Sequence, residues 1–518
     1  MNMNGAQALA RTLADCGVEV CFANPGTSEM HFVAALDETP QMHAVLGLFE
    51  GVVTGAADGY GRLAGKPAAT LLHLGPGLGN GLANLHNARR AHSPIVNVVG
   101  DHATYHKCYD PPLESDIDGI ARAVSSWVYR CAHPSEVGRD AAEAVAAASR
   151  GVATLILPAD VSWSRGGKPA APNEPVPLET VSEQTIESTA AITRSGQKTV
   201  LLLGGTGLGQ EGLAAASRVA RATGVTLLAE SYPARLRRGA GVPAVERLAY
   251  RANDALAQLG GTAQLVLAGA RPPVAFFAYP DKASGLVPSS ATVHTLAGNE
   301  GTDVVDALTR LAEMVAADIE PALAPASRPA CPSGPLTARN WADVIGALLP
   351  ENSIISDESL TSGMATLPAA TAGAPAHDLL SNTGGAIGQG LPVATGAAIA
   401  CPDRPVICLE ADGSAMYTLS ALWTQAREGL NVTTVVLNNQ AYAVLRMELQ
   451  LVGAQSGGER ANDLMDLTRP PLDFVSLATG MGVPASRATT AEELAEEFEK
   501  ALAEPGPHLI DAALTAQS

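Results

Sequence analysis

The sequence predicts an α/β protein built from three doubly wound, mainly parallel sheets. Short apolar runs that end in turn residues alternate with Ala-rich helical stretches throughout the 518 residues. The runs are continuously apolar, which is typical of parallel strands covered by helices on both faces. A chain of this length also exceeds what one hydrophobic core usually holds, so more than one domain is expected.

Two Pro-rich stretches without apolar periodicity, 166–185 and 321–336, are interpreted as linkers. They divide the chain into an N-terminal domain at 1–165, a middle domain at 186–320 and a C-terminal domain at 337–518. Each has an ordinary domain size.

The elements follow in chain order. The N-terminal strands are predicted in VEVCFANPG, MHAVLGLFE, AATLLHLGPG, PIVNVVGD and ATLILPAD, with helices over GVVTGAADGYGRLAG and GLANLHNARRA. The middle domain has KTVLLLGGTG, GVTLLAES and AQLVLAGA, and the C-terminal domain has NSIISD, PVICLEADG, TTVVLNNQ and PHLIDAAL. Ligands bind at the carboxyl ends of strands in such sheets, so residues that follow strands are expected to carry the chemistry.

Composition narrows the function classes. A net charge of −19 argues against nucleic acid or an anionic membrane as a main partner. Seven cysteines without a CxxC pair indicate neither a zinc site nor a disulfide framework. No basic segment followed by an apolar core opens the chain, and no apolar run is long enough to span a membrane. We therefore expect a cytoplasmic protein.

Two neighbouring strand ends carry an acid and an amide. Asp412 follows the run PVICLEA, and Asn439 follows TTVVLN. Carboxylate and amide oxygens are ligands that suit Mg²⁺. Gly413 and Ser414 would open the next helix, whose N-terminal amides can hold a phosphate.

This stretch resembles the diphosphate-binding motif of thiamine-diphosphate enzymes, which begins Gly-Asp-Gly and ends Asn-Asn. Ala411 replaces the first glycine here. The resemblance implies thiamine diphosphate and Mg²⁺ as cofactors. It also implies that Asp412, the Asn439 side chain and the Ala441 carbonyl are the metal ligands.

The same resemblance implies a glutamate in the N-terminal domain, and GLFEGVVTGAADGYGR supplies Glu50. Its apolar neighbours would desolvate the carboxylate. Its implied role is to share a proton with the aminopyrimidine ring of the cofactor, while the carbanion chemistry belongs to the cofactor.

Further cofactor contacts are implied around two Gly-containing segments. In SNTGGAIGQG, the Gly385 carbonyl would accept from the exocyclic amine, and Ile387 would hold the cofactor bent. In DESLTSG, Thr361 aligns with a hydroxyl that contacts the diphosphate, although Leu360 stands where some relatives have a polar residue.

The resemblance covers essentially the whole chain and is strongest to acetolactate synthase large-subunit-like proteins, so acetolactate formation from two pyruvates is the leading prediction. Benzoylformate decarboxylase is the alternative. Thr27 in NPGT matches an active-site serine of that family, and His73 in LLHLGPG matches a proton-transferring histidine.

Three features depart from these patterns, each from one of the two families. The second histidine of benzoylformate decarboxylase falls near Phe277, and the Phe-Gln pair of acetolactate synthases appears as Pro112-Leu113. The middle domain has no counterpart of their flavin signature, so FAD is not expected. Leu113, Phe276 and Phe277 would form an apolar wall suited to a hydrophobic acyl or aryl group.

Two other functions compete with this one. GGTGLG at 204–209, with Glu230 on the next strand, resembles a dinucleotide loop of an oxidoreductase, although one Gly-rich turn is weak support. A catalytically inactive regulatory paralogue is the other, and the retention of Glu50, Asp412 and Asn439 argues against it. His102 and His106, four residues apart, lack an evident third metal ligand and are interpreted as part of a surface or active-site loop.

We therefore expect an enzyme that attacks a 2-oxo acid, expels CO₂, and yields either an aldehyde or a product of carboligation. The resemblance places each cofactor between two subunits, so a homodimer or homotetramer is expected. The acceptor substrate and the binding of a regulatory small subunit stay open.

Overall fold

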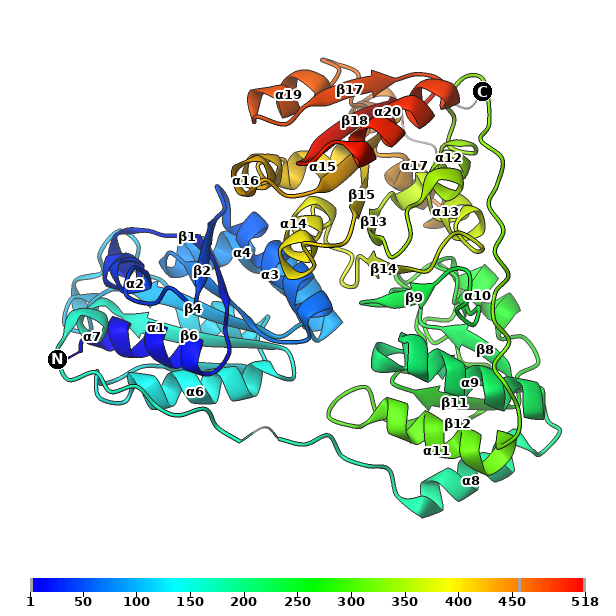
Figure 1. The fold of residues 1–518 in the computed structure, drawn as a ribbon, viewed down its shortest axis with the longest axis horizontal. Coiled ribbons are helices and arrows are strands. Elements are labelled where there is room, and N and C mark those ends of the chain that lie inside the picture. The colour runs from blue at the N-terminus through cyan, green and yellow to red at the C-terminus, as the bar shows by residue number, and fades with distance from the viewer. Residues whose placement is uncertain (1–2, 175, 455–457, 516–518) are drawn as a thin grey trace.

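The computed structural model describes residues 3–174, 176–454 and 458–515. Its three sheets, dominated by parallel strands and flanked by helices, confirm the predicted fold class. Figure 1 shows the N-terminal sheet at the left, the middle sheet at the lower right and the C-terminal sheet at the top. The predicted domain boundaries remain a prediction.

The N-terminal sheet has six parallel strands. In spatial order they are β2 (His43–Leu46), β1 (Val20–Asn24), β3 (Ala68–Leu72), β4 (Ile95–Asp101), β6 (Val152–Pro158) and β5 (Trp127–Arg130). One face is covered by α1 (Gly5–Asp15), α2 (Met30–Leu36), α6 (Val137–Ala148) and α7 (Ala159–Trp163). The other face is covered by α3 (Glu50–Ala64), α4 (Leu74–Ala91) and α5 (Ile117–Arg122).

The middle sheet has five parallel strands. Their spatial order is β10 (Glu246–Arg247), β8 (Thr226–Ala229), β7 (Thr199–Leu203), β11 (Gln264–Ala268) and β12 (Thr292–Ala297). Its helices are α8 (Glu183–Thr193), α9 (Gln210–Thr223) and α11 (Val304–Ala316) on one face, and α10 (Ala252–Gln258) on the other.

The C-terminal sheet has seven strands, six of them parallel. Their spatial order is β17 (Ala485–Ala488), β18 (His508–Ala513), β16 (Val432–Asn438), β15 (Val406–Ala411), β13 (Ile354–Glu358), β14 (His377–Ser381) and β9 (Leu236–Arg238). Its helices are α12 (Trp341–Leu348), α13 (Thr366–Ala370), α14 (Gly390–Ala400), α15 (Asp412–Thr418), α16 (Ala421–Glu428), α17 (Ala443–Leu451), α18 (Glu459–Asp463), α19 (Phe474–Gly480) and α20 (Ala491–Ala503).

β9 comes from the chain segment between β8 and β10 of the middle sheet. It pairs antiparallel with β14, with Leu236 opposite Leu379. The middle segment thus supplies an edge strand to the C-terminal sheet.

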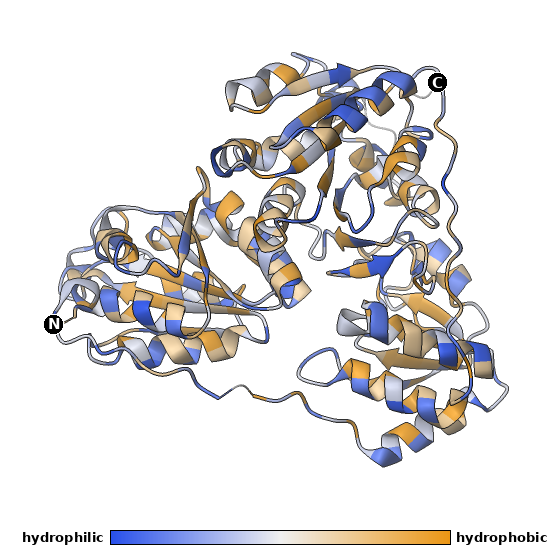
Figure 2. Cartoon of the chain, in the orientation of Figure 1, coloured by the Kyte–Doolittle hydropathy of each residue, from blue (hydrophilic) through white to orange (hydrophobic). Residues whose placement is uncertain are grey.

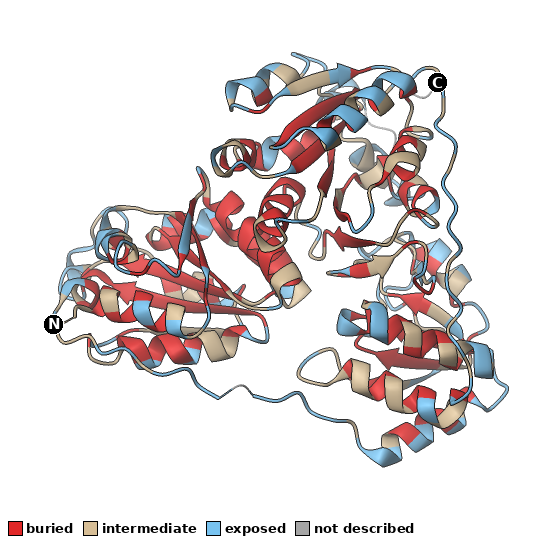
Figure 3. Ribbon diagram, in the orientation of Figure 1, coloured by how far each residue is buried: buried red, intermediate tan, exposed pale blue. Residues whose placement is uncertain are grey.

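The central strands are buried because helices cover both faces, as the continuously apolar runs predicted, whereas the outer strands β2, β5 and β12 are partly exposed. Figure 2 shows most central strands in orange as apolar, and Figure 3 shows them in red as buried. Across the described residues, no helix is long and apolar enough to cross a membrane.

One predicted element differs from the structure. The glycines after His73 were expected to form a turn, but α4 already begins at Leu74. The chain turns sharply at Leu74 itself, which has a positive φ of 50°. His73 therefore precedes the first turn of a helix.

α3 and α14 cross at very short range, and glycines make this possible. A Cβ at Gly59 would lie 2.1 Å from the Val393 carbonyl oxygen, and one at Gly396 would lie 1.8 Å from that of Ala56. Beside the crossing, the buried ion pair of Arg62 and Asp58 reaches β14, since Arg62 Nη1 donates to the Ser381 carbonyl at 2.8 Å.

Asp378, only 1% exposed, anchors β9 to the C-terminal sheet. Its carboxylate accepts from Arg235 Nε at 3.0 Å and Arg404 Nη2 at 2.7 Å, and Arg237 Nη1 lies 3.5 Å away. Burial opposes ionisation, but the Arg235 and Arg404 guanidiniums outweigh it and lower the pKa of Asp378.

Asp378→Asn should lower the free energy of unfolding by about 1–3 kcal/mol, because it leaves three guanidiniums around a neutral amide. The midpoint of urea unfolding measures this. Asp318→Asn at an exposed site is the control and should change stability by less than about 0.5 kcal/mol. Since the folded pKa of Asp378 is lowered, the difference between wild type and Asp378→Asn should be full above the ordinary carboxyl pKa. It should shrink as the pH falls through the folded value.

Candidate functional site

The acid and the amide predicted as metal ligands lie on adjacent strand ends. β15 and β16 are parallel neighbours, and Ala411 pairs with Leu437. Asp412 begins α15 directly after β15, and the Asn439 side chain follows β16. The N–H of Gln440, between Asn439 and Ala441, donates to Asp412 Oδ2 at 2.6 Å, so the metal-ligand candidates share one corner.

Asp412 is 2% exposed, and no cationic side chain among the described residues pairs with it. Burial raises the pKa of Asp412 to about 6, although N–H groups of Gly413 and Gln440 oppose the shift. A cation at this carboxylate would compensate for the desolvation of its charge. The carboxylate, the Asn439 amide oxygen and the Ala441 carbonyl are hard oxygen donors, so the residues fit Mg²⁺.

The first turn of α15 carries a hydroxyl that lacks a partner in the part of the chain that the structure describes. Ser414 is 1% exposed, and its Oγ has no hydrogen-bond partner among the described residues. Gly413 faces the Tyr442 ring, where a Cβ would lie 2.4 Å from Cε1. A buried, unpaired hydroxyl at a helix N-terminus fits a diphosphate group.

Glu50 begins α3 and is 8% exposed. Asn80 Nδ2 donates to its Oε2 at 2.9 Å. A Cβ at Gly77 would lie 3.0 Å from Glu50 Oε1 and 3.3 Å from the Cβ of His73. Glu50 and His73 therefore flank the same glycine and form one corner of the N-terminal domain.

Residues 382–389, which we call the strap, carry Gly385 and Ile387 between β14 and α14. α4 of the N-terminal domain holds the strap: Asn87 Nδ2 donates to the Ala386 carbonyl at 2.8 Å, and His86 Nε2 lies 3.1 Å from the Gly384 carbonyl oxygen. Asn84 Nδ2 contacts the Gly388 carbonyl at 3.2 Å and the Gly51 carbonyl at 2.7 Å. Asn84 thus joins the strap to the start of α3.

Sequence reasoning missed a buried acid pair beneath the strap. The Glu358 carboxylate accepts from the N–H groups of Gly388, Gln389 and Gly390 at 3.0, 2.8 and 2.7 Å. Burial, and then the nearby Glu358 charge, raise the pKa of Glu410 well above its ordinary value. Glu358 therefore fixes the end of the strap as a helix-capping carboxylate.

His73 is held by an acid that the sequence did not single out. Its Nδ1 lies 2.8 Å from Oε2 of Glu29, which is 2% exposed. Glu29 also accepts from the Gly26 N–H at 2.8 Å. Thr27, predicted to be the hydroxyl residue of the site, is exposed, and it is Ser28 Oγ that lies 3.4 Å from His73 Nδ1.

Two glycines give this pair its space. A Cβ at Gly26 would lie 2.1 Å from His73 Nδ1, and one at Gly100 would lie 1.7 Å from Glu29 Oε1. The close approach of the His73 and Glu29 side chains to these backbones explains why glycine stands at positions 26 and 100.

The loop with His102, His106 and Leu113 is closed by Lys107. Its Nζ donates to Asp101 at 3.0 Å and to Glu114 at 2.7 Å. His102 and His106 contact one another edge to face at 5.7 Å. Among the described residues, no group of three or more His, Cys, Asp or Glu side chains could hold a metal ion.

Of the predicted apolar wall, Phe276 and Phe277 lie side by side, with ring centroids 4.8 Å apart. Phe276 packs on the strap, since a Cβ at Gly385 would lie 2.4 Å from its Cζ. Leu113 is 37% exposed on its own loop. No described ring contact joins it to the phenylalanines.

The glycine loop of the middle sheet packs against the turn that follows β11. A Cβ at Gly204 would lie 2.4 Å from the Gly269 carbonyl oxygen. Glu230, the acid noted after the next strand in the dinucleotide interpretation, accepts from the Gly205 N–H at 3.3 Å, and burial raises the pKa of Glu230 to about 7.

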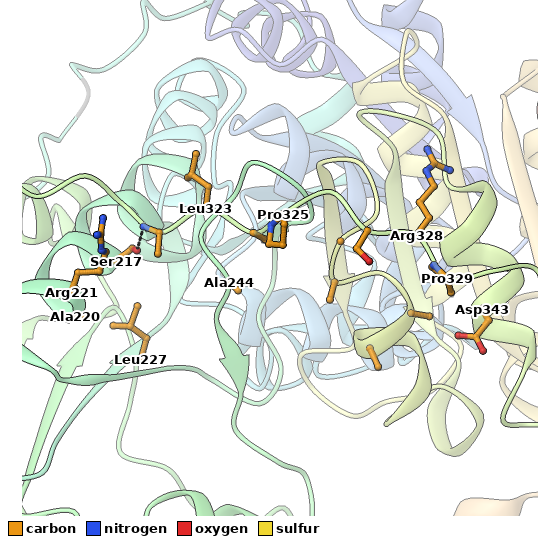
Figure 4. Close-up of a pocket in the computed structure, with 17 residues that line it drawn as sticks. Ser217, Ala220, Arg221, Leu227, Ala244, Leu323, Pro325, Arg328, Pro329 and Asp343 are labelled. Carbon is orange, nitrogen blue, oxygen red and sulfur yellow. Dashed lines mark hydrogen bonds between the residues drawn. The ribbon is translucent and has the colours of Figure 1, made fainter.

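A hollow of about 940 Å³ lies elsewhere, between α9, the 321–336 segment and the α12–α13 region. Figure 4 shows Ser217, Leu323 and Arg328 among its lining residues, and Ser217 Oγ accepts from the Ala322 N–H at 2.9 Å. None of the predicted site residues lines it, so it is separate from the candidate site.

Comparisons with known proteins identify the family. Residues 3–118 match the family pattern described as thiamine pyrophosphate enzyme, N-terminal TPP binding domain, and 361–512 match its C-terminal TPP binding domain. A Mycobacterium tuberculosis H37Rv protein, provisionally named acetolactate synthase large subunit IlvX, is 61% identical over 98% of both chains. The chain belongs to the thiamine pyrophosphate enzyme family.

Other members of the family differ in their named reactions. Benzoylformate decarboxylase of Pseudomonas aeruginosa is 30% identical over 96% of both chains. The structure of a thiamine diphosphate-dependent 4-hydroxybenzoylformate decarboxylase from Rhodococcus jostii RHA1 superposes with a TM-score of 0.85 at 24% identity, covering 99% of this chain and 100% of that one. That likeness concerns the fold.

The predicted site residues form two groups within one chain. Glu50 and His73 belong to the N-terminal corner, whereas Asp412, Gly413, Ser414, Asn439 and Ala441 belong to the C-terminal corner. Gly385 and Ile387 lie in the strap, and Thr361 lies half-buried in the turn after β13. No described hydrogen bond joins Glu50 or His73 to the C-terminal corner.

Asp412→Asn should weaken Mg²⁺-dependent binding of thiamine diphosphate by about 100-fold or more, because the charged ligand of the metal is lost. Quenching of intrinsic tryptophan fluorescence, titrated with Mg²⁺ at fixed thiamine diphosphate, measures this. Asp403→Asn, an exposed site before β15, should titrate like wild type. An unchanged Mg²⁺ requirement in Asp412→Asn would remove Asp412 from the metal site.

Proposed function

We propose that this protein is a thiamine-diphosphate- and Mg²⁺-dependent decarboxylase of aryl-substituted 2-oxo acids. The observation that carries this proposal is the His73–Glu29 pair, a histidine oriented by a buried carboxylate at the strand-end rim. The aromatic pair of Phe276 and Phe277 beside the strap supports a large apolar substituent.

Different residues of the chain have different roles at the proposed site. Asp412, Asn439 and Ala441 would hold Mg²⁺, and Gly413 and Ser414 would hold the diphosphate. When bound, the cofactor supplies the carbanion chemistry that removes CO₂ from a 2-oxo acid. The protein positions the reacting groups, excludes water and moves protons.

Glu50 would share a proton with the aminopyrimidine ring of the cofactor. Its carboxylate is buried, and Asn80 fixes one oxygen, which leaves Oε1 beside Gly77 for the ligand. Because Glu50 and Asp412 belong to separate corners of one chain, we propose that a homodimer pairs the N-terminal corner of one subunit with the C-terminal corner of the other.

His73 would deliver the proton that completes an aldehyde product. With Nδ1 engaged by Glu29, Nε2 is the ring atom left for the substrate. Ser28, 3.4 Å from Nδ1, is the hydroxyl that the geometry favours over Thr27.

Acetolactate formation from two pyruvates, the leading prediction from sequence, is the second candidate. The 61% identical relative with a provisional acetolactate synthase name favours it. Against it, Pro112-Leu113 replaces the Phe-Gln pair, and the aromatic pair at the strap suits a larger substituent than methyl.

Product analysis by NMR decides between the two. Protein loaded with thiamine diphosphate and Mg²⁺ should convert benzoylformate to benzaldehyde and leave pyruvate unchanged. Acetolactate from pyruvate, without benzaldehyde, would establish the second candidate. No product from either acid would contradict both substrate assignments.

Glu50→Gln should lower the turnover of the accepted 2-oxo acid by about 10²–10⁴-fold, because proton exchange at the pyrimidine is lost. Binding of thiamine diphosphate should stay within a few-fold of wild type. Glu143→Gln, an exposed site on α6, is the control and should be fully active. Wild-type turnover by Glu50→Gln would refute the mechanism.

Gly26→Ala should lower kcat/KM by about 10²-fold, since the new methyl group would overlap His73 Nδ1 and displace the ring. Gly79→Ala is the matched glycine control on α4, where an added Cβ meets nothing within 4 Å. Steady-state kinetics with circular dichroism on both variants separates displacement of His73 from unfolding. Equal activity of the two variants would show that the position of His73 does not matter.

A further inference from the structure

A cluster of aromatic side chains stands between the middle sheet and the strap. Tyr232 follows β8, Tyr250 follows β10 and Phe276 follows β11, so all three come from the carboxyl ends of middle-sheet strands. The Phe276 ring centroid lies 5.7 Å from that of Tyr232 and 5.5 Å from that of Tyr250. One edge of Phe276 touches Gly385 of the strap.

A carboxylate from another element lies at one end of this cluster. Glu448 lies on α17, the helix that follows the metal-ligand candidates Asn439 and Ala441. Tyr250 Oη donates to its Oε1 at 2.6 Å, and Tyr279 Oη donates to its Oε2 at 3.0 Å. Each carboxylate oxygen receives one hydroxyl, which leaves each with a lone pair for a further donor.

The rings nearest the strap are open. Phe276 is 40% exposed and Phe277 is 51% exposed, although they pack against one another. Such a surface, apolar along its length and carrying a hydrogen-bond acceptor at its end, matches an aromatic ring with a polar far end.

The charges nearby favour a neutral donor over a cation. Arg251 Nη2 lies 3.3 Å from Met447 Sδ, directly beside Glu448 in the chain. Arg247 Nη1 lies 3.4 Å from Ser381 Oγ, at the end of β14 that leads into the strap. A positively charged substituent would be repelled by these two guanidiniums, whereas a neutral hydroxyl would not be.

We propose that Glu448, held by Tyr250 and Tyr279, is a specificity-determining residue that accepts a hydrogen bond from a hydroxyl at the far end of an aryl 2-oxo acid. Phe276 and Phe277 line the path of the ring. The proposal rests on the proposed function, because it assigns the substituent end of that same substrate site.

The test compares 4-hydroxyphenylglyoxylate with 4-methoxyphenylglyoxylate, which has a similar ring but no donor. The full-length protein is loaded with thiamine diphosphate and Mg²⁺. Wild type should show at least a tenfold higher kcat/KM for the hydroxy acid. Glu448→Leu should reduce the ratio to within twofold of one, while unsubstituted phenylglyoxylate keeps most of its kcat/KM.

Three further variants keep the result interpretable. Tyr279→Phe should retain the preference, because Glu448 stays as the acceptor. Glu459→Gln, an exposed acid on α18, should match wild type. Where Glu448→Leu turns over none of the three acids, Glu448→Gln replaces it, and this shape-conserving change should reduce the ratio at least threefold. The proposal would be overturned if wild type had equal kcat/KM values for the hydroxy and methoxy acids. It would also be overturned if the ratio of the two values were unchanged in the Glu448 variant that is active.

A binding measurement separates this proposal from the proposed function. Calorimetry with 4-hydroxyphenylacetate and 4-methoxyphenylacetate requires no turnover. If no 2-oxo acid reacts, the proposed function fails. The subsite proposal then stands if wild type binds 4-hydroxyphenylacetate at least fivefold more tightly than 4-methoxyphenylacetate and Glu448→Leu shows no such preference. It falls if wild type binds the two ligands equally.

Discussion

The short-range crossing of α3 and α14 is the constraint on which the rest of the site depends. Backbone approaches backbone at Gly59 and Gly396, where no side chain fits. α3 begins at Glu50, and α14 is entered from the strap, so the crossing fixes the N-terminal and C-terminal corners of one subunit relative to each other. Close packing of this kind leaves little freedom to slide, because any shift brings backbone atoms into overlap.

Buried carboxylates organise the site, and each has its own means of compensation. Glu358 is stabilised by the amides at the start of α14, and Glu29 by an amide and His73. Asp412 has amides but no cation among the described side chains, and its pKa is raised by burial. A buried strand-end carboxylate with amide donors but no cationic partner is suited to a metal ion.

Much of this arrangement could be predicted from the sequence, because it depends on local order. Continuous apolar runs specify parallel strands, and strands followed by Asp412 and Asn439 place those residues on one rim. Glu29, Glu358 and Glu448 were missed because their roles depend on partners far along the chain. Glu448, for example, meets Tyr250 across 198 positions. Thr27 was favoured over Ser28 because a motif fixes a residue's place in the chain but not which of two adjacent hydroxyls faces His73.

The position of β9 limits how the chain can be divided into fragments. A break at 321–336 would leave β9 on one fragment and its partner β14 on the other. The C-terminal fragment would then expose the apolar edge of β14, which invites pairing with other chains. A cut at 321–336 therefore cannot separate the middle and C-terminal sheets without removing an edge strand from the C-terminal sheet. Recombination that exchanges middle domains between relatives has to carry residues 236–238 together with a β14 that they fit.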